Sequence, residues 1–248
     1  MYRKGFQMGN LKEKVVVITG AAKGMGAAEA KMAAERGATV IVTDVLDERG
    51  EETAASINSS YHHLDVSNQA NWHSVISEIM DTYGRIDGLV NNAGIFIQKT
   101  LFDDAQEAFE AMMRVNQLGT YLGIECVAPI MRDQNQGSIV NISSVAGLRG
   151  QRNIGYVASK FAVTGMTKAI ALQLAQFNIR CNSVHPGAIS TDMSQGLGPD
   201  DVALLTRKTP MKRIGEPEEV SEVVMFLLSE ASSYLTGAEI AVDGGFIL

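Results

Sequence analysis

The sequence predicts one α/β domain built on a doubly wound parallel sheet with helices on both faces. Two observations support this fold class. Short runs of β-branched residues alternate with helix-forming segments along the chain, as in parallel sheets whose connections are helices. A glycine-rich turn follows the first run. The ligand of such a sheet lies along the carboxyl ends of the strands.

Composition limits the number of domains and the kinds of partner. The chain has 248 residues, 46% of them apolar and 20% charged, which suits one folded domain over residues 11–248. The net charge of −7 gives no electrostatic support for a nucleic acid or an anionic membrane as partner. The longest apolar runs have the length of strands, well short of the roughly 18 residues that a membrane helix needs. We therefore expect neither a nucleic acid nor a membrane as partner.

The N-terminus and the cysteines indicate a reduced compartment. The N-terminal segment, residues 1–10, is short and polar and has no apolar region, so we expect a flexible tail and no secretory signal. Cys126 and Cys181 have neither disulfide nor metal-ligand spacing. Three histidines also lack ligand spacing: His62, His63 and His73. We expect a cytoplasmic location and no metal site.

The first strand and the turn after it are typical of a nucleotide-binding unit. Residues 14–19 are expected to form a buried strand, and residues 27–36 a helix that Gly37 ends. Glycines let backbone N–H groups approach a pyrophosphate at the positive end of a helix. The glycines here are spaced G-x-x-x-G-x-G. The residues of the turn expected at a cofactor are Gly20, Lys23, Gly24, Met25 and Gly26.

Asp44 follows the second expected strand, residues 39–43. An acidic residue at this place, about 20 residues after the glycine turn, accepts hydrogen bonds from the adenosine ribose. It also repels a 2′-phosphate, so Asp44 predicts NAD in preference to NADP. The alternative is that Asp44 is a solvated cap before the expected surface helix, residues 48–58.

The next two strands also end in small or polar residues. The expected ranges are 61–66 for the third strand, 68–83 for a helix and 86–90 for the fourth strand. Asp65 and Val66 end the third strand, and Ser67 is the expected N-cap of the helix. The fourth strand leads into Asn91, Asn92, Ala93 and Gly94. Such strand ends form a floor on which a ligand lies against the backbone.

A long helical segment, residues 104–132, contains Asn116 within an apolar stripe. An asparagine inside a helix disfavours it and tends to bond backbone groups, so structural strain and function are both possible reasons for it. A fifth strand is expected over residues 137–144, and it ends in Ser143 and Ser144.

Tyr156 and Lys160 lie four residues apart in an expected helix, residues 155–176. That spacing places both side chains on one helix face. We expect the ammonium to favour phenolate and to lower the tyrosine pKa from about 10 towards neutrality. Such a phenol exchanges a proton with a reacting oxygen. For these residues alone, the alternative is an exposed pair on an amphipathic helix.

The last third of the chain completes the alternation. The expected elements are a strand over 178–184, a helix over 217–230 and a strand over 239–242. Pro217 is expected at the first helical position, after Glu216. Glycines and prolines interrupt the pattern between the first two elements, and residues 193–212 are expected to form a substrate lid.

In this order and spacing, these motifs resemble those of the short-chain dehydrogenase/reductase family, over residues 12–246. The matching positions are Thr19, Gly20, Gly24, Gly26, Asp65, Val66, 91–94, Asn116, Ser144, Tyr156, Lys160, Pro186, Gly187 and 242–245. The resemblance implies a Rossmann-type fold, a nicotinamide cofactor and a homotetramer.

The resemblance assigns catalytic roles to four residues. Tyr156 would give a proton to a substrate carbonyl or take one from an alcohol. Lys160 would lower the tyrosine pKa and hold the nicotinamide ribose. Ser144 would bond the reacting oxygen, and Asn116 would support a water that leads from Lys160 to solvent.

The resemblance also implies a wider cofactor site. Thr191 would bind the nicotinamide carboxamide, and Asp65 with Val66 would flank the adenine. The other residues implied at the cofactor are Asn92, Ala93, Gly94, Pro186, Gly187 and Ile189.

The position of the serine departs from the family pattern. Ser144 lies twelve residues before Tyr156, whereas the family usually has thirteen. Either the loop 148–155 is one residue shorter, or Ser143 supplies the hydroxyl. We prefer Ser144, because loops absorb deletions more easily than strands do, and because moving to Ser143 turns the hydroxyl to the other strand face.

The function that this resemblance implies is NAD-dependent interconversion of a secondary alcohol and a ketone. Residues 178–187 and 236–245 resemble bacterial 3α/20β-hydroxysteroid dehydrogenases in particular. The expected pocket residues are Phe96, Leu148, Ile154 and Met193. They are apolar, so the substrate is expected to be neutral and hydrophobic, unless Arg149 or Arg152 turns inward. The alternatives are a 3-oxoacyl-carrier-protein reductase, which Asp44 disfavours, and a non-catalytic dinucleotide sensor.

Overall fold

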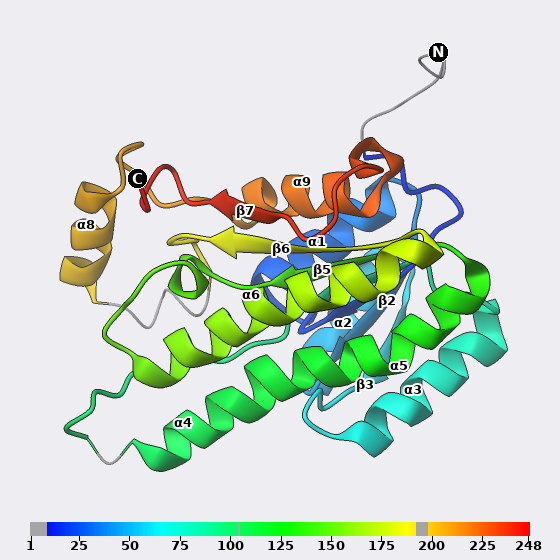
Figure 1. The fold of residues 1–248 in the computed structure, drawn as a ribbon, viewed down its shortest axis with the longest axis horizontal. Coiled ribbons are helices and arrows are strands. Elements are labelled where there is room, and N and C mark those ends of the chain that lie inside the picture. The colour runs from blue at the N-terminus through cyan, green and yellow to red at the C-terminus, as the bar shows by residue number, and fades with distance from the viewer. Residues whose placement is uncertain (1–8, 104, 192–197) are drawn as a thin grey trace.

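A seven-stranded parallel sheet forms the centre of the computed structural model, which describes residues 9–103, 105–191 and 198–248 (Figure 1). The strand order is β3-β2-β1-β4-β5-β6-β7. The strands are β1 (Val15–Thr19), β2 (Thr39–Asp44), β3 (Ser60–His63), β4 (Gly88–Asn91), β5 (Gly137–Ile142), β6 (Ile179–Pro186) and β7 (Glu239–Val242). The predicted Rossmann-type, doubly wound sheet is confirmed.

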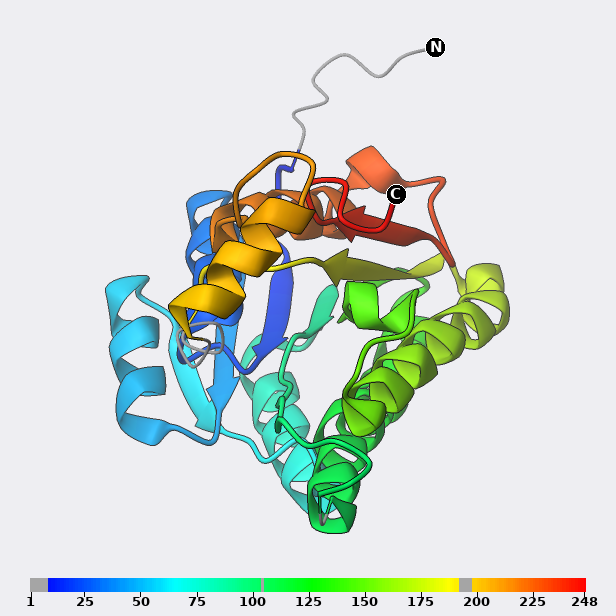
Figure 2. The ribbon, with the colours of Figure 1, turned by 90° about the vertical axis from the view of Figure 1, so that its left-hand side faces the viewer.

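Helices cover both faces of the sheet (Figures 1 and 2). The main helices are α1 (Gly24–Glu35), α2 (Asp47–Ser56), α3 (Gln69–Tyr83), α4 (Gln106–Met112), α5 (Gly119–Gln134), α6 (Ile154–Leu174), α8 (Pro199–Lys208) and α9 (Pro217–Leu228). The short helical turns are η1 (Met113–Leu118), η2 (Val145–Gly147), η3 (Ala175–Phe177) and η4 (Glu230–Ser232).

Alternate residues of each strand enter two separate cores, because successive strand side chains point to opposite faces. Val16 and Ile18 of β1 pack with α1, α2 and α9. Val15 and Val17 of the same strand pack with α3, α5 and α6, around the fully buried Trp72. The continuous β-branched runs in the sequence therefore reflect burial on both faces.

Two local predictions differ from the structure. Helix α1 begins at Gly24 and not at residue 27, so the last glycines of the turn form its first turn. Ser67 is not the N-cap of α3, because its hydroxyl bonds the Asp65 carboxylate at 2.8 Å. Asn68 caps the helix instead, accepting from the Asn71 N–H at 3.2 Å. The prediction of Pro217 at the first helical position is confirmed.

The long helix expected over 104–132 is interrupted. Helices α4 and α5 continue one another through η1, a π-helical turn that contains Asn116. Such turns insert an extra residue into a helix and are frequent at functional sites. The mid-helix asparagine thus lies where the regular hydrogen-bond pattern is broken.

The expected N-terminal tail falls mostly outside the described residues, which begin at Gly9. Gly9 is buried, and a Cβ added there would collide with the Arg36 side chain. Within the described ranges, none of the helices is both long and apolar enough to cross a membrane.

Candidate active site

The expected site residues gather at the carboxyl ends of the central strands. Strands β1 and β4 are neighbours in the sheet although β2 and β3 lie between them in the sequence. This is the point where the strand order reverses, and open α/β sheets bind ligands there. Figure 2 views the molecule from the side on which these strand ends lie.

The glycine turn packs tightly enough to exclude side chains. A Cβ on Gly26 would lie 2.3 Å from the carbonyl oxygen of Gly20, and one on Gly20 would lie 2.8 Å from the Ala93 Cα. Gly20 and Gly24 have φ values of +65° and +58°, which glycine adopts without strain. No side chain caps α1. Together these features give the backbone close access to an anion at a helix N-terminus.

The segment after β4 is hydrogen-bonded to the end of β1. The hydroxyl oxygen of Thr19 accepts from the N–H groups of Asn92 at 3.1 Å and Ala93 at 3.0 Å. The Asn92 amide donates back to the carbonyls of Thr19 and Gly20, at 2.9 and 3.0 Å. These bonds hold the glycine turn and the floor formed by residues 91–94 as one unit.

Asp44 lies at the end of β2 and is 9% exposed. Its carboxylate accepts from the N–H groups of Ala22 at 3.0 Å, Val45 at 2.7 Å and Leu46 at 3.1 Å. The alternative of a solvated cap is wrong, because the carboxylate is buried and the N-cap position of α2 is Leu46. Asp44 ties the glycine turn to the β2–α2 connection.

Asp65 and Val66 lie beyond β3. Asp65 accepts from the N–H and the hydroxyl of Ser67, at 2.9 and 2.8 Å. The Val66 carbonyl accepts from the Trp72 indole at 3.0 Å. A Cβ on Gly119 would lie 2.7 Å from the Val66 side chain. Val66 therefore forms a fixed apolar surface against the start of α5.

Tyr156 and Lys160 lie on α6, with the Lys160 ammonium 5.7 Å from the centre of the Tyr156 ring. Lys160 is 4% exposed, and its ammonium donates to the Ile142 carbonyl at 2.8 Å. The alternative of an exposed pair is wrong for Lys160, because a buried ammonium bonded to a strand end is not a solvated surface charge.

The expected direction of the Tyr156 pKa is wrong for this structure. Burial raises the pKa of Tyr156, and a hydrogen bond with the Ser144 side chain lowers it only in part. Burial also lowers the pKa of Lys160 to about 8. Removal from water disfavours the charged form of each group.

Ser143 and Ser144 point in different directions, as neighbours in extended backbone do. The Ser143 hydroxyl donates to the Lys160 carbonyl at 3.0 Å and lies 3.2 Å from the Thr164 hydroxyl. The Ser144 hydroxyl bonds the Tyr156 side chain and accepts from the Ala146 N–H at 3.1 Å. Only Ser144 of the two therefore adjoins the phenol.

Asn116 is 1% exposed and uses its amide to fix the loop after β4. Its oxygen accepts from the Ile95 N–H at 2.8 Å, and its nitrogen donates to the Ile95 carbonyl at 3.0 Å and the Ser159 hydroxyl at 3.1 Å. A Cβ on Gly94 would lie 3.3 Å from this amide oxygen and 3.4 Å from the Lys160 ammonium. Asn116 and Lys160 thus both approach Gly94 on the side where a Cβ would project.

The segment after β6 reaches the glycine turn. The Gly187 N–H donates to the Val242 carbonyl at 2.9 Å, continuing the ladder beyond Pro186. Ile189 pairs with Gly215. A Cβ on Gly24 would lie 3.6 Å from the Thr191 Cβ. The predicted cofactor residues on this segment therefore lie opposite the start of α1.

The expected substrate residues have different surroundings. The Phe96 ring meets the Tyr156 ring edge to face, with 5.1 Å between the ring centres. Ile154 lines a separate hollow of about 370 Å³ between α4, α6 and residues 99–106. Leu148 follows η2 and is half-buried. Met193 lies outside the described residues.

The two arginines left open by the sequence have different surroundings. Arg149 stacks on the Phe246 ring at 5.1 Å and donates to the Phe246 carbonyl at 3.3 Å. Arg152 is exposed. Arg149 therefore joins the loop after β5 to the C-terminal segment.

His185 is a residue of this region that sequence reasoning missed. It is fully buried on β6, and its Nδ1 lies 2.9 Å from the Ser144 carbonyl oxygen. The alternation of side chains along β6 could have indicated this residue, because it places Ser183 and His185 on the same face of the strand. Their side chains lie 2.8 Å apart.

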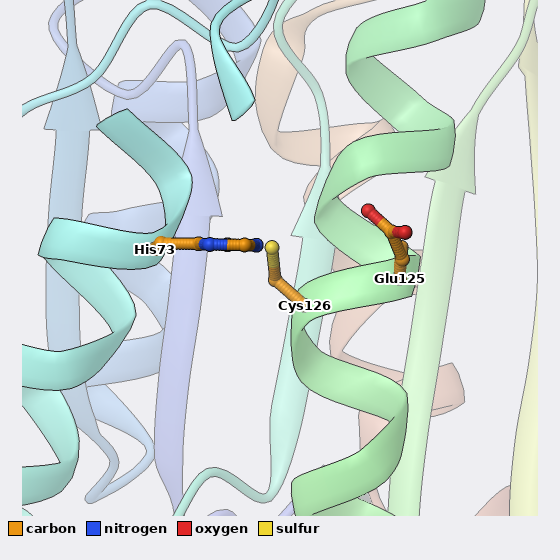
Figure 3. A group of neighbouring side chains, drawn as sticks. All are labelled: His73, Glu125 and Cys126. Atoms are coloured by element: carbon orange, nitrogen blue, oxygen red, sulfur yellow. The ribbon is translucent and has the colours of Figure 1, made fainter. Parts of the chain in front are cut away.

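A group of metal-ligand residue types lies away from the strand ends (Figure 3). His73 of α3 and Glu125 and Cys126 of α5 place potential ligand atoms within 4.8 Å of one another. Their spacing in the sequence hid this proximity, because two helices supply them. Burial and Glu125 raise the Cys126 pKa to about 11, and Gln69 donates to Glu125 at 3.0 Å. Without a bound ion, the Cys126 thiol is therefore protonated at neutral pH.

A larger hollow, of about 710 Å³, lies at the opposite end of the sheet. Lys14, Asp87 and Arg180 are among its lining residues. Asp87 already pairs with Arg85 at 2.6 Å and Lys14 at 3.7 Å. Its size does not make it the candidate active site, because none of the expected site residues lines it.

Comparison with known proteins places the chain among reductases and dehydrogenases. The family profile described as enoyl-(acyl carrier protein) reductase matches residues 20–247. The cyclopentanol dehydrogenase of Comamonas sp. (strain NCIMB 9872) is 40% identical, over 96% of this chain and 99% of that protein. The 3-alpha-(or 20-beta)-hydroxysteroid dehydrogenase of Mycobacterium bovis is 42% identical, over 96% and 91%.

Two further likenesses bear on substrate and fold. The 3-oxoacyl-[acyl-carrier-protein] reductase of Thermotoga maritima is 40% identical, over 96% of this chain and 99% of that protein. The crystal structure of levodione reductase superimposes with a TM-score of 0.90 at 35% identity, over 95% of this chain and 98% of that chain.

Proposed function

Because the chain belongs to the short-chain dehydrogenase/reductase family, we propose that it interconverts a secondary alcohol and a ketone with NAD as the cofactor. The observation that supports this most directly is the hydrogen-bonded pair of Ser144 and Tyr156 beside the buried ammonium of Lys160. This group lies next to a glycine turn at the carboxyl ends of the strands, where open α/β sheets bind their ligands.

Tyr156 exchanges the proton in this proposal. Burial raises its pKa, so the phenol is protonated at neutral pH and suited to donate to a ketone oxygen during reduction. In the oxidative direction it must first lose that proton. The Ser144 hydroxyl orients the reacting oxygen, and Asn116 fixes the loop that carries Gly94 beside Lys160.

The residues present fit a dinucleotide. Gly20, Gly24 and Gly26 form a tight turn at the start of α1, in which a Cβ at Gly20 or Gly26 would collide with neighbouring backbone. Asp44 at the end of β2 suits ribose hydroxyls. The other residues that would hold the cofactor are Lys23, Met25, Asp65, Val66, Asn92, Ala93, Gly94, Pro186, Gly187, Ile189 and Thr191. When bound, NAD supplies the two-electron acceptor for alcohol oxidation.

A neutral, hydrophobic and cyclic alcohol is the proposed substrate. The Phe96 ring packs against Tyr156, and Arg149 is turned to Phe246 instead of offering a free cation. Two relatives are named for cyclopentanol and for hydroxysteroids. The described part of the proposed lid, residues 198–212, contains helix α8, while residues 193–197 lie outside the described ranges.

The test is cofactor turnover with a panel of substrates. Cyclopentanol, a 3α-hydroxysteroid and a 3-oxoacyl thioester should be compared with NAD(H) and NADP(H). Alcohol oxidation with NAD is expected. Preferred reduction of the thioester would favour a 3-oxoacyl-carrier-protein reductase. The similarity to the Thermotoga maritima protein of that name supports this alternative. Cofactor binding without turnover on any substrate would favour the sensor alternative.

We also propose the homotetramer that the sequence resemblance implies, acting in the cytoplasm. Tyr121 of α5 and Phe161 and Leu172 of α6 are 46%, 46% and 84% exposed, and large exposed apolar side chains are typical of subunit contacts. Light scattering after size-exclusion chromatography tests the proposed assembly.

A further inference from the structure

We propose that His185 is a positioning residue that holds Ser144 in place through the main-chain carbonyl of that serine. The inference rests on the proposed function, since Ser144 is the hydroxyl assigned to the reacting oxygen. His185 itself has no direct contact with Tyr156 in this proposal and acts only through the backbone of the serine.

The hydrogen bonds fix the chemistry of the imidazole. His185 is fully buried, with Nδ1 2.9 Å from the Ser144 carbonyl oxygen and Nε2 2.8 Å from the Ser183 hydroxyl oxygen. A carbonyl oxygen only accepts, so Nδ1 carries the hydrogen. In the neutral ring Nε2 then accepts from the Ser183 hydroxyl. The tautomer follows from these partners.

Ser144 needs this support because it lies where the chain leaves the sheet. The last ladder bond on this side joins the Ser143 N–H to the Val184 carbonyl at 2.8 Å. Ser144 then begins the tight turn η2, and its carbonyl accepts from the Gly147 N–H at 2.8 Å. His185 is the second donor to that carbonyl, and it comes from the neighbouring strand. It therefore ties the turn to the sheet.

The hydrogen bond from His185 to the Ser144 carbonyl does not depend on the charge of the imidazole. Burial lowers the pKa of His185, and the bond to the Ser144 main chain and Glu239 oppose this effect. The charges of Lys160 and Lys168 lower the pKa further. The ring is thus neutral at neutral pH. Protonation would place a hydrogen on Nε2, and the Ser183 hydroxyl would then donate to the Ala238 carbonyl, 3.3 Å away. Because Nδ1 donates in both states, we expect support for Ser144 without a pH switch.

Two replacements separate positioning from simple packing. In His185→Asn the side-chain amide places a donor near the former Nδ1, whereas His185→Leu removes it. We expect His185→Leu to lower kcat for ketone reduction at least tenfold with a change of less than threefold in the KM for NADH. His185→Asn should stay within about threefold of the wild type. Equal losses in both variants would overturn the proposal.

A double-mutant comparison tests the route through the serine. In a Ser144→Ala background, His185→Leu should lower kcat by less than threefold, because the hydroxyl that it positions is already absent. A second tenfold loss in that background would mean that His185 acts elsewhere. If His185→Leu does not fold, His185→Gln takes its place, because its longer amide reaches towards Ser183 and cannot donate from the Nδ1 position.

Hydrogen exchange measured by mass spectrometry gives a readout without turnover. Peptides that cover residues 143–149 should exchange faster in His185→Leu than in His185→Asn, while peptides of α3 should be unchanged. If no alcohol or ketone reacts with the wild type, the proposed function fails and this measurement still tests the positioning. Unchanged exchange in an active enzyme would overturn the positioning alone.

Discussion

The Lys160 ammonium donates to the main-chain carbonyl of Ile142 at 2.8 Å, so the last residue of β5 holds the positive charge of the site. Ser144 lies two residues further along the same backbone. The charge and the serine hydroxyl are therefore positioned by one strand end, and a shift of β5 would move both.

The pH dependence of ketone reduction should follow Lys160. Burial lowers the pKa of Lys160 to about 8 and raises that of Tyr156. As the pH rises, the ammonium is lost first, while the phenol still has its proton. We expect kcat/KM for reduction to fall above about pH 8. Lys160→Arg should move the fall to higher pH. A profile that stays flat from pH 7 to 10 would contradict this assignment.

Tyr156→Phe should lower turnover by about a hundredfold or more, the range for loss of a general acid. NADH binding, followed by fluorescence, should be nearly unchanged, because the phenol acts on the substrate. Tyr234→Phe is a matched control, since Tyr234 is fully exposed. Half the wild-type activity in Tyr156→Phe would mean that the proton comes from another group.

The two serines should respond differently to the same change. Ser144→Ala should lower kcat at least tenfold, with a modest loss of stability because its bond to the Ala146 N–H is also removed. Ser143→Ala removes a hydroxyl bonded to the Lys160 carbonyl, so it should lower stability by about 1 kcal/mol and kcat much less. Steady-state kinetics and thermal unfolding of both variants test which serine supplies the hydroxyl. The reverse order in kcat would assign the hydroxyl to Ser143.

Asp44 should set the cofactor preference. We expect the wild type to prefer NAD over NADP by a large factor in kcat/KM. Asp44→Asn combined with Val45→Arg should narrow or reverse that preference, since the charge is removed and a cation added. The asparagine oxygen still accepts from Ala22 or Val45, which limits the structural damage. Equal use of both cofactors by the wild type would remove Asp44 from this role.

Glu29 should make the protein less stable as the pH rises. It is fully buried on α1, and neither carboxylate oxygen has a hydrogen-bond partner in the part of the chain that the structure describes. Burial raises its pKa from 4.5 to about 8. The unfolded chain loses this proton near pH 4.5, so stability falls between about pH 4.5 and 8.

Replacing Glu29 should therefore stabilise the protein at neutral pH. Glu29→Gln isolates the loss of ionisation, and Glu29→Met also removes the buried polar atoms. Urea unfolding at pH 5 and pH 8 should show a gain of up to a few kcal/mol at pH 8 and much less at pH 5. An equal gain at both pH values would mean that the carboxyl group is not protonated in the fold.

Local patterns predicted the fold well because each strand and helix has its own periodicity. The strand before Gly20, the helix after Pro217 and the apolar stripe around Trp72 all appear where the sequence indicates. Contacts between distant segments were not predictable in the same way. The donors to Asp44 and the bond from His185 to Ser144 depend on which strand ends become neighbours.

The predicted direction of the Tyr156 pKa was wrong for a related reason. The spacing to Lys160 is visible in the sequence, and the charge effect follows from it. The depth of burial is not visible there, since Phe96 and the end of β5 supply it from other parts of the chain. Desolvation then determined the sign.

The bonds from Thr19 to Asn92 and Ala93 join positions that are 73 and 74 residues apart. During synthesis the glycine turn emerges long before its partner segment, and a nascent chain that ends within α3 lacks this closure. Non-local pairing of this kind slows folding. The stretches that form early therefore lack a complete dinucleotide site. Adding the cofactor should slow global unfolding without speeding the first folding steps.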